Sequence, residues 1–270
     1  MAEKQSTSPV TVATLQRMKS AGEKITCLTC YDASFTRVLE AAGVDMFIVG
    51  DSLGMVLKGH ETTVPVTMAD MLYHAANVAR VGRHALRVVD MPYMSYANPD
   101  QALGNAARLV AEGGADMVKL EGGQDKADIV RHLVGHDIPV CGHIGLLPQS
   151  IEELGGYHVQ GRDEDGARAL LADAQALEAA GATLLVMECI PAELAALITS
   201  SVNMPTIGIG AGPDCDGQVL VLYDMLGITP GKVPKFVRNF LQDTDSVPSA
   251  VKAYVDAVKD GSFPAPEHCF

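Results

Sequence analysis

The chain contains 270 residues and carries a formal net charge of −13, with a sequence pI near 4.9. Its Lys and Arg residues form no basic stripe, so we expect no binding to nucleic acid or to an anionic membrane. No run reaches the roughly 18 apolar residues of a membrane span, and the polar tail of residues 1–9 lacks the apolar core of a signal peptide. These features predict a soluble, cytoplasmic protein that acts on small molecules.

Short apolar, β-branched segments alternate with helical segments along the chain. Thr11 is the expected N-cap of a first helix that ends at Gly22. Strands are expected at residues 24–32, 45–52, 86–92, 116–122, 138–145, 183–189, 205–212 and 218–225. Helices are expected between most of these strands, at residues 33–43, 68–82, 99–114, 125–135, 165–181 and 192–201.

Eight buried strands separated by helices indicate βα units around a parallel sheet. Their number and the chain length favour a closed (β/α)₈ TIM barrel, with an open, doubly wound sheet as the alternative. The sequence shows no low-complexity linker and no change in composition, so we expect a single domain over residues 1–270. The N-terminal helix and further helices in residues 232–270 are expected to pack outside the barrel.

One predicted strand, in residues 116–123, carries Lys119 and Glu121 in an apolar run that ends at paired glycines. Because side chains alternate along a strand, these two residues point in the same direction. Burying both charges is costly unless each finds a partner. The pair is therefore either a structural ion pair or part of a functional site.

Charged residues recur at the C-terminal ends of the predicted strands, where the active sites of such barrels lie. The residues found there are Asp32, Asp51, Asp90, Lys119, Glu121, His143 and Glu188. Carboxylates packed together without partners raise one another's pKa and destabilise a fold. A hard cation resolves that conflict, and oxygen ligands without a His or Cys cluster favour Mg²⁺ over zinc.

Local sequence leaves other roles open for each of these residues. Asp51 can bind a metal or substrate, or cap the next helix, and Asp90 can be an ordinary turn residue. His143 can be a satisfied polar group, and Glu188 suits either a general base or a salt bridge at the rim. The glycines of residues 208–212 lack the spacing of a dinucleotide fingerprint, so we interpret them as a tight loop that lets a ligand approach the backbone.

Cys27 and Cys30 have the spacing of a redox or metal-binding pair. They lie within a predicted strand, where an offset of three residues places the two thiols on opposite faces. No second pair completes a zinc site, so buried free thiols are the better interpretation.

Eight motifs occur in order along residues 29–218. They are Thr29-Cys30-Tyr31-Asp32, Val49-Gly50-Asp51-Ser52-Leu53-Gly54-Met55, Pro65-Val66-Thr67, Val118-Lys119-Leu120-Glu121-Gly122-Gly123, Cys141-Gly142-His143-Ile144-Gly145-Leu146, Gly155-Gly156-Tyr157, Ile207-Gly208-Ile209-Gly210-Ala211-Gly212 and Asp216-Gly217-Gln218. Together they resemble the 3-methyl-2-oxobutanoate hydroxymethyltransferase (ketopantoate hydroxymethyltransferase) family. Leu147 stands where the family frequently has Thr, and this departure affects no residue assigned to chemistry.

The resemblance implies a barrel enzyme that binds one Mg²⁺ per subunit and uses 5,10-methylenetetrahydrofolate as co-substrate. It implies transfer of a hydroxymethyl group to 3-methyl-2-oxobutanoate through a Mg-stabilised enolate, giving 2-dehydropantoate for pantothenate and coenzyme A synthesis. The residues it implies are Asp51, Asp90 and Glu121 for the metal, Asp51, Ser52, Asp90, Lys119 and His143 for substrate, and Glu188 as proton acceptor. It also implies a homodecamer.

Two other functions remain as alternatives at this point. A Mg²⁺-dependent carbon–carbon lyase of 2-oxo acids, similar to isocitrate lyase and phosphoenolpyruvate mutase, also uses acidic strand ends but needs no folate. A catalytic Cys in a flexible loop would favour the lyase, and the sequence shows no convincing candidate. A non-catalytic ligand-binding barrel would tolerate loss of a site carboxylate, whereas Asp51, Asp90, Glu121 and Glu188 are all present.

Overall fold

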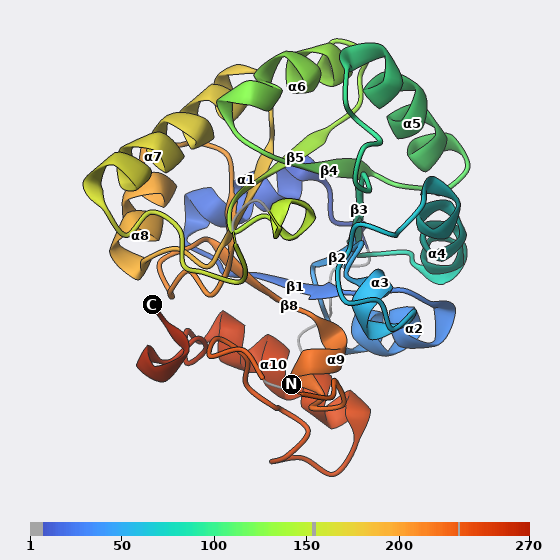
Figure 1. Ribbon diagram of the computed structural model, residues 1–270. Helices are drawn as coiled ribbons and strands as arrows, with labels where there is room; N and C mark the ends of the chain where they lie inside the picture. Colours follow the sequence, from blue (N-terminus) through green and yellow to red (C-terminus); the bar gives the residue numbers. More distant parts are fainter. Residues whose placement is uncertain (1–7, 153–154, 232) are drawn as a thin grey trace.

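The computed structural model, which describes residues 8–152, 155–231 and 233–270, shows eight parallel strands closed into a barrel (Figure 1). The strands are β1 (Ile25–Thr29), β2 (Met46–Val49), β3 (Leu86–Asp90), β4 (Met117–Glu121), β5 (Val140–Gly145), β6 (Leu184–Glu188), β7 (Thr206–Ile209) and β8 (Gly217–Leu220). They pair in chain order, and β1 also pairs with β8. The predicted (β/α)₈ barrel is confirmed, and the open sheet is wrong because both of its edges are joined.

Helices surround the barrel and follow the predicted segments closely (Figure 1). They are α1 (Val12–Ala21), α2 (Ala33–Ala42), α3 (Leu53–Val56), α4 (Met68–Val81), α5 (Pro99–Ala111), α6 (Ala127–Val134), α7 (Glu164–Ala179), α8 (Ala192–Ser201), α9 (Leu222–Met225) and α10 (Val247–Lys259). The 3₁₀ turns are η1 (Gln124–Lys126), η2 (Pro148–Ser150) and η3 (Pro266–His268). None of the described helices is long and apolar enough to cross a membrane.

Side-chain hydrogen bonds set where several helices begin. Thr11 caps α1 as predicted, and Thr67 forms a capping box with Asp70 at the start of α4. At the other end of α1 and α2, Gly22 and Gly43 adopt left-handed backbone conformations with φ of 69° and 87°. Glycine tolerates this conformation because it has no Cβ, so both helices stop there.

Two predictions of secondary structure need correction, and part of a third lies outside the described residues. The strand expected over residues 218–225 ends at Leu220, because the chain bends and forms the one-turn helix α9. The tail expected to be helical contains α10 and the turn η3 among its described residues, whereas residues 233–246 form no helix, although Val233, Phe236, Val237, Phe240 and Leu241 have helical spacing. Residues 1–7 of the predicted polar tail lie outside the described ranges.

Alternation along each strand divides the core into two layers. On β4, Met117 belongs to the cluster inside the barrel, while Val118 and Leu120 belong to the layer between strands and helices. Lys119 and Glu121 have the same parity as Met117, so they point into the barrel as predicted. Cys27 and Cys30 are likewise buried in different layers, as the strand interpretation of their spacing requires.

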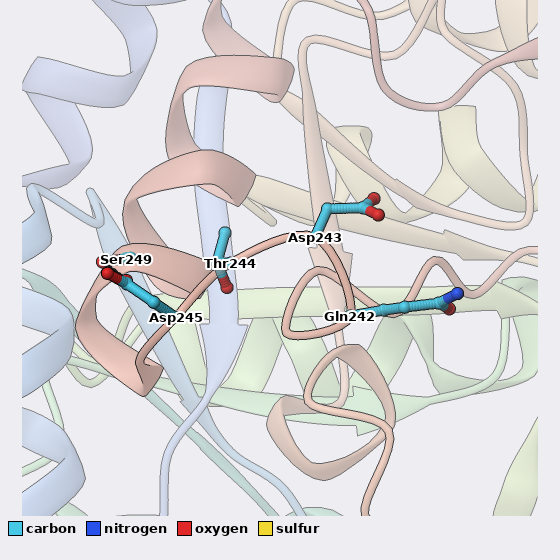
Figure 2. A pocket seen from close by; sticks show the side chains of 5 residues that line it. All are labelled: Gln242, Asp243, Thr244, Asp245 and Ser249. Carbon is cyan, nitrogen blue, oxygen red and sulfur yellow. Dashed lines mark hydrogen bonds between the residues drawn. The ribbon is translucent and has the colours of Figure 1, made fainter.

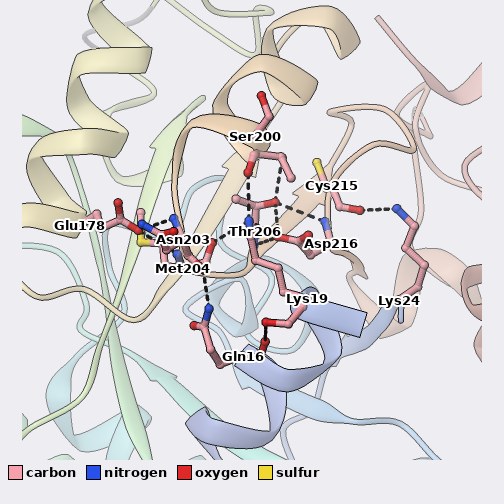
Figure 3. A network of polar contacts seen from close by, with 12 residues as sticks. Gln16, Lys19, Lys24, Glu178, Ser200, Asn203, Met204, Thr206, Cys215 and Asp216 are labelled. Carbon is pink, nitrogen blue, oxygen red and sulfur yellow. Dashed lines mark hydrogen bonds and ion pairs between the residues drawn. The ribbon is translucent and has the colours of Figure 1, made fainter. Parts of the chain in front are cut away.

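Helix α1 closes the N-terminal end of the barrel. Its Leu15 and Met18 pack into the interior cluster. Lys19 Nζ lies 2.9 Å from Asp216 Oδ2 and donates to the carbonyls of Thr199 and Met204, which ties α1 to the chain around β7 and β8 (Figure 3). Because α1 covers this end, the site of the barrel is expected at the other end, where the C-terminal ends of the strands lie.

Helix α10 packs outside the joint between the first and last strands, next to β1 and α2. The fully buried Tyr254 hydroxyl lies 2.8 Å from the Cys27 carbonyl on β1 and 2.9 Å from the Gln218 carbonyl on β8. One tyrosine therefore bridges the two strands whose pairing closes the barrel.

Candidate active site

The predicted charged residues meet at the C-terminal end of the barrel interior. Those that end or follow strands β2 to β5 are at most 4% exposed, namely Asp51, Asp90, Lys119, Glu121 and His143. The Glu188 side chain at the end of β6 is 14% exposed. Glu188 is therefore the charged group of this set that solvent or a ligand reaches most easily.

Strand register brings Lys119 next to Asp90. The two residues are partners across β3 and β4, and Lys119 Nζ lies 3.1 Å from Asp90 Oδ1. Asp90 Oδ2 accepts a hydrogen bond from the Asp51 backbone N–H. Burial disfavours the charge on Lys119, but the carboxylates of Asp90, Glu121 and Asp51 outweigh it and raise the pKa of the ammonium above its usual value.

The carboxyl groups in this cluster also affect one another. Burial, and then the charges of Asp90 and Glu121, raise the pKa of Asp51 well above its ordinary value. Burial likewise raises the pKa of Asp90, against the opposing effect of Lys119. These buried carboxyl groups are therefore stabilised in their charged form by a nearby positive charge, which Lys119 supplies in part.

His143 lies between two carboxylates. Its Nδ1 is 3.4 Å from Glu121 Oε1 and 3.3 Å from Lys119 Nζ, and its Nε2 is 3.2 Å from Glu188 Oε2. Burial and Lys119 lower the pKa of the imidazole, but Glu121 and Glu188 overcome them and raise it to about 9. His143 thus connects the buried carboxylate of Glu121 to the accessible carboxylate of Glu188.

Ser52 lies at the edge of this cluster, half-buried at the start of α3, and its Oγ is 2.9 Å from the Tyr31 hydroxyl. The backbone of Gly50 passes close by: a Cβ at this position would lie 2.9 Å from Ser52 Oγ and 3.5 Å from Asp90 Oδ2. Gly50 is therefore needed so that the chain's own polar groups can come together.

Sequence reasoning missed two buried residues that contact the cluster. Gln149 in η2 donates from Nε2 to Asp51 Oδ2 at 2.8 Å, and Tyr96 donates from its hydroxyl to Gln149 Oε1. Both come from loops that follow strands, where no periodicity marks a site residue. The sequence signal for Gln149 is a polar residue next to an apolar turn, and this signal is weak when the positions of the residues it contacts are unknown.

Two predicted features have a structural explanation instead. Asp32 caps α2, accepting hydrogen bonds from the backbone N–H groups of Ser34 and Phe35, so it does not join the carboxylate cluster. In the loop of residues 208–212, a Cβ on Gly210 would meet the rings of Phe236 and Phe270. The chain's own packing therefore accounts for this glycine without a ligand.

The predicted metal ligands supply suitable atoms. Asp51, Asp90 and Glu121 offer the oxygen donors that Mg²⁺ prefers, and Asp90 Oδ1 and Glu121 Oε1 are buried without a hydrogen bond. Across the described ranges, however, no three His, Cys, Asp or Glu side chains are arranged as a ready metal site. The donor chemistry fits a hard cation, while the present contacts of these carboxylates are to Lys119, His143 and Gln149.

Tyr157, in the loop that follows β5, lies near the candidate site. The Tyr157 hydroxyl contacts the sulfur of Met55 on α3 at 3.6 Å. Partial burial raises the pKa of Tyr157, and the charges of Glu188 and Asp51 add to this effect. The phenol therefore lies within electrostatic reach of the candidate site.

A hollow on the protein surface, shown in Figure 2, does not belong to this site. It is lined by Gln242, Asp243, Thr244, Asp245 and Ser249. These residues precede or begin α10, outside the barrel, and none of them is a predicted site residue.

The fold and the charged cluster define a (β/α)₈-barrel enzyme whose site lies at the C-terminal ends of the strands. Solved structures with the same architecture include phosphoenolpyruvate phosphomutase from Streptomyces platensis, with a TM-score of 0.60 and 15% identity over 80% of this chain and 83% of that one. Another is 2,3-dimethylmalate lyase, a member of the PEP mutase/isocitrate lyase superfamily, with a TM-score of 0.57 and 16% identity over 80% and 82% of the two chains. At these identities the likeness shows the fold alone.

Sequence comparison then identifies the family. A model of the ketopantoate hydroxymethyltransferase family matches residues 9–266. The 3-methyl-2-oxobutanoate hydroxymethyltransferase of Nitrosococcus oceani is 58% identical over 255 residues, covering 94% of this chain and 97% of that protein. The chain belongs to the ketopantoate hydroxymethyltransferase family. The prediction of a transferase is confirmed, and the comparisons support neither a lyase nor a non-catalytic barrel.

Proposed function

We propose that this enzyme transfers a hydroxymethyl group from 5,10-methylenetetrahydrofolate to 3-methyl-2-oxobutanoate, giving 2-dehydropantoate for pantothenate and coenzyme A synthesis. The observation that carries the proposal is the position of Glu188. Its carboxylate is partly exposed at the edge of a buried cluster that contains Lys119 and the carboxylates of Asp51, Asp90 and Glu121. A base next to a cation-binding cluster is what proton removal beside a carbonyl group requires.

Glu188 is the group proposed to remove the proton from C3 of the keto acid. His143 Nε2 lies 3.2 Å from its Oε2 and holds the carboxylate at the edge of the cluster. C3 then forms a bond to the methylene carbon of the folate as one of the two carbon–nitrogen bonds of that carbon breaks. Water supplies the hydroxyl oxygen as the second carbon–nitrogen bond breaks and tetrahydrofolate leaves. The two released nitrogens take up two protons, matching the one that Glu188 removed from C3 and the one that water gives up.

Binding of the keto acid is proposed to use residues around the accessible edge of the cluster. Lys119 supplies positive charge next to the substrate carboxylate, and Ser52 and His143 offer hydrogen bonds. Asp51, Asp90 and Glu121 are proposed to hold one Mg²⁺ per subunit, and Asp51 and Asp90 also lie next to the substrate. When bound, this ion would stabilise the negative charge that develops on the keto oxygen as the enolate forms.

Enolisation can be tested separately from folate chemistry. In D₂O, with Mg²⁺ and no folate, we expect the C3 proton signal of 3-methyl-2-oxobutanoate to disappear from the NMR spectrum at an enzyme-dependent rate. Addition of 5,10-methylenetetrahydrofolate should then yield 2-dehydropantoate. Bound keto acid that shows neither exchange nor product would contradict the proposal.

Three further parts of the proposal concern the whole protein. We propose a cytoplasmic enzyme, a single domain over residues 1–270 and a homodecamer, all of which follow from the sequence and the family resemblance. Light scattering on the purified protein measures the mass of the assembly, for comparison with ten times the 28.5 kDa of one chain. A monomer or dimer under conditions of full activity would overturn the decamer.

A further inference from the structure

Gln149 joins residues from three different strand ends. It is 6% exposed and lies in η2, immediately after the loop that follows β5. Its Nε2 donates to Asp51 Oδ2 at 2.8 Å and to the Met91 carbonyl at 2.9 Å. Its backbone N–H donates to Glu121 Oε2 at 3.0 Å. One residue thus contacts two of the carboxylates proposed to hold the metal.

Tyr96 fixes the orientation of the Gln149 amide. The Tyr96 hydroxyl oxygen accepts a hydrogen bond from the Glu121 backbone N–H at 3.3 Å, so its single proton is free for Gln149 Oε1, at 2.5 Å. A flipped amide would turn its oxygen toward the Asp51 carboxylate and the Met91 carbonyl, both of which only accept hydrogen bonds. The amide therefore has one acceptable orientation.

This arrangement occupies one oxygen of each carboxylate. Gln149 binds Oδ2 of Asp51 through its side chain and Oε2 of Glu121 through its backbone. The second Glu121 oxygen, Oε1, is buried without a hydrogen bond and lies 3.4 Å from His143 Nδ1. A donor that holds one oxygen of a carboxylate leaves the other to a cation or a substrate.

We propose that Gln149, oriented by Tyr96, is a positioning residue that sets which oxygens of Asp51 and Glu121 face the bound cation and keto acid. The inference rests on the proposed function for the identity of the ligands. A neutral amide suits this role, because it donates hydrogen bonds without adding a further charge to a crowded group of carboxylates.

The test is binding of Mn²⁺ alone, measured by electron paramagnetic resonance on the full-length protein. Gln149→Met removes the amide, keeps the backbone N–H and approximates the volume, so we expect Mn²⁺ binding to weaken about 10-fold or more. Tyr96→Phe should weaken it in the same direction. In the Gln149→Met background, Tyr96→Phe should weaken binding less than it does in the wild type, because the part of its effect that acts through the amide is already lost and only its contact with the Glu121 backbone N–H remains.

Gln218→Met is the matched control. Gln218 is a buried Gln on β8 whose Nε2 donates to the Gly212 carbonyl at 2.9 Å, and within the described parts of the chain its side chain forms no hydrogen bond with a residue of the proposed site. This variant should lose thermal stability while keeping wild-type Mn²⁺ affinity.

In the C3 exchange reaction, Gln149→Met should raise the concentrations of metal and keto acid needed for half-maximal rate more than it lowers the maximal rate.

Several outcomes would overturn the inference. Wild-type Mn²⁺ affinity in folded Gln149→Met would do so, as would fully additive effects of Gln149→Met and Tyr96→Phe. If Gln149→Met does not fold, unchanged affinity in Tyr96→Phe alone decides against the inference. A wild-type enzyme that makes 2-dehydropantoate alongside any of these results leaves the proposed function intact, whereas failure of the wild type to make it overturns the function itself.

Discussion

Asp90 and Lys119 face each other across neighbouring strands, with Asp90 Oδ1 3.1 Å from Lys119 Nζ and both side chains at most 5% exposed. Removing the ammonium would leave the buried Asp90 without its ion-pair partner and would take a positive charge away from the neighbourhood of Asp51 and Glu121. Loss of one member of a buried pair typically costs about 3 to 5 kcal/mol. Lys119→Met should therefore lower the free energy of unfolding by about 3 kcal/mol at pH 8.

The same variant should show a characteristic pH dependence. The pKa values of Asp51 and Asp90 are raised in the folded protein. A carboxyl with a raised folded pKa destabilises the fold increasingly as pH rises from its unfolded pKa to its folded pKa. Loss of Lys119, whose charge lowers both pKa values, raises them further and so enlarges this penalty. The loss in Lys119→Met should thus be smaller at pH 5 than at pH 8 in urea unfolding. Lys19→Met, which breaks the ion pair with Asp216 at the other end of the barrel, should not show this trend.

Glu188→Gln tests the proposed base. The substitution keeps the size of the side chain and removes its ability to accept a proton, so C3 exchange should slow about 100-fold or more. Keto-acid binding, measured by calorimetry, should change less than threefold, because the other binding groups remain. Glu178→Gln is a suitable control, since Glu178 accepts hydrogen bonds from the Asn203 and Met204 backbone far from this chemistry. Wild-type exchange in Glu188→Gln would assign the proton transfer to another group.

The joint between the first and last strands gives a stability prediction. Tyr254→Phe removes the hydroxyl that lies between the carbonyls of Cys27 and Gln218. Because both carbonyls lie in a buried environment, we expect a loss of about 1 to 2 kcal/mol in urea unfolding. Tyr73→Phe, at a side chain that is 67% exposed, should leave stability unchanged. Equal effects in the two variants would show that the bridging hydroxyl contributes nothing specific.

Asp70, at the start of α4, is expected to make a pH-dependent contribution to stability. Although burial opposes it, hydrogen bonds from Lys58 and Thr67 lower the pKa of Asp70 to about 2. A lowered folded pKa stabilises the protein above the unfolded value of 3.8, and this stabilisation is lost as pH falls toward 2. Asp70→Asn should therefore cost about 1 kcal/mol at pH 7, and the difference from wild type should shrink between pH 4 and pH 2. Asp128→Asn, at an exposed ion pair, should show little effect at any pH.

Much of the barrel follows from local sequence. The period-two alternation of β4 correctly places Lys119 and Glu121 on the inside, and glycines correctly mark the ends of α1 and α2. These features depend only on residues near one another in the chain. Local sequence does not distinguish the one-turn helix α9 from a continuation of β8, because four residues carry too little periodicity.

The partners within the site depend on information that a single segment lacks. Lys119 pairs with Asp90 because of the register between β3 and β4, although Glu121 is the nearer charge in sequence. Gln149 reaches Asp51 across 98 positions of the chain. Asp32 has the same strand-end position as the cluster members, yet its side chain accepts hydrogen bonds from the N–H groups of Ser34 and Phe35 and caps α2. Only the packed barrel distinguishes these cases.

The bridge made by Tyr254 also bears on how a ribosome can produce this protein. Tyr254 follows Cys27 by 227 positions, so the first strand is synthesised long before the residue that joins it to the last strand exists. The edge of β1 that pairs with β8 also stays free until residues 217–220 have been made, and free edges of apolar strands invite pairing with other chains. A nascent chain stalled before β8 is therefore expected to aggregate or to need a chaperone, even though its proposed catalytic residues have already been made.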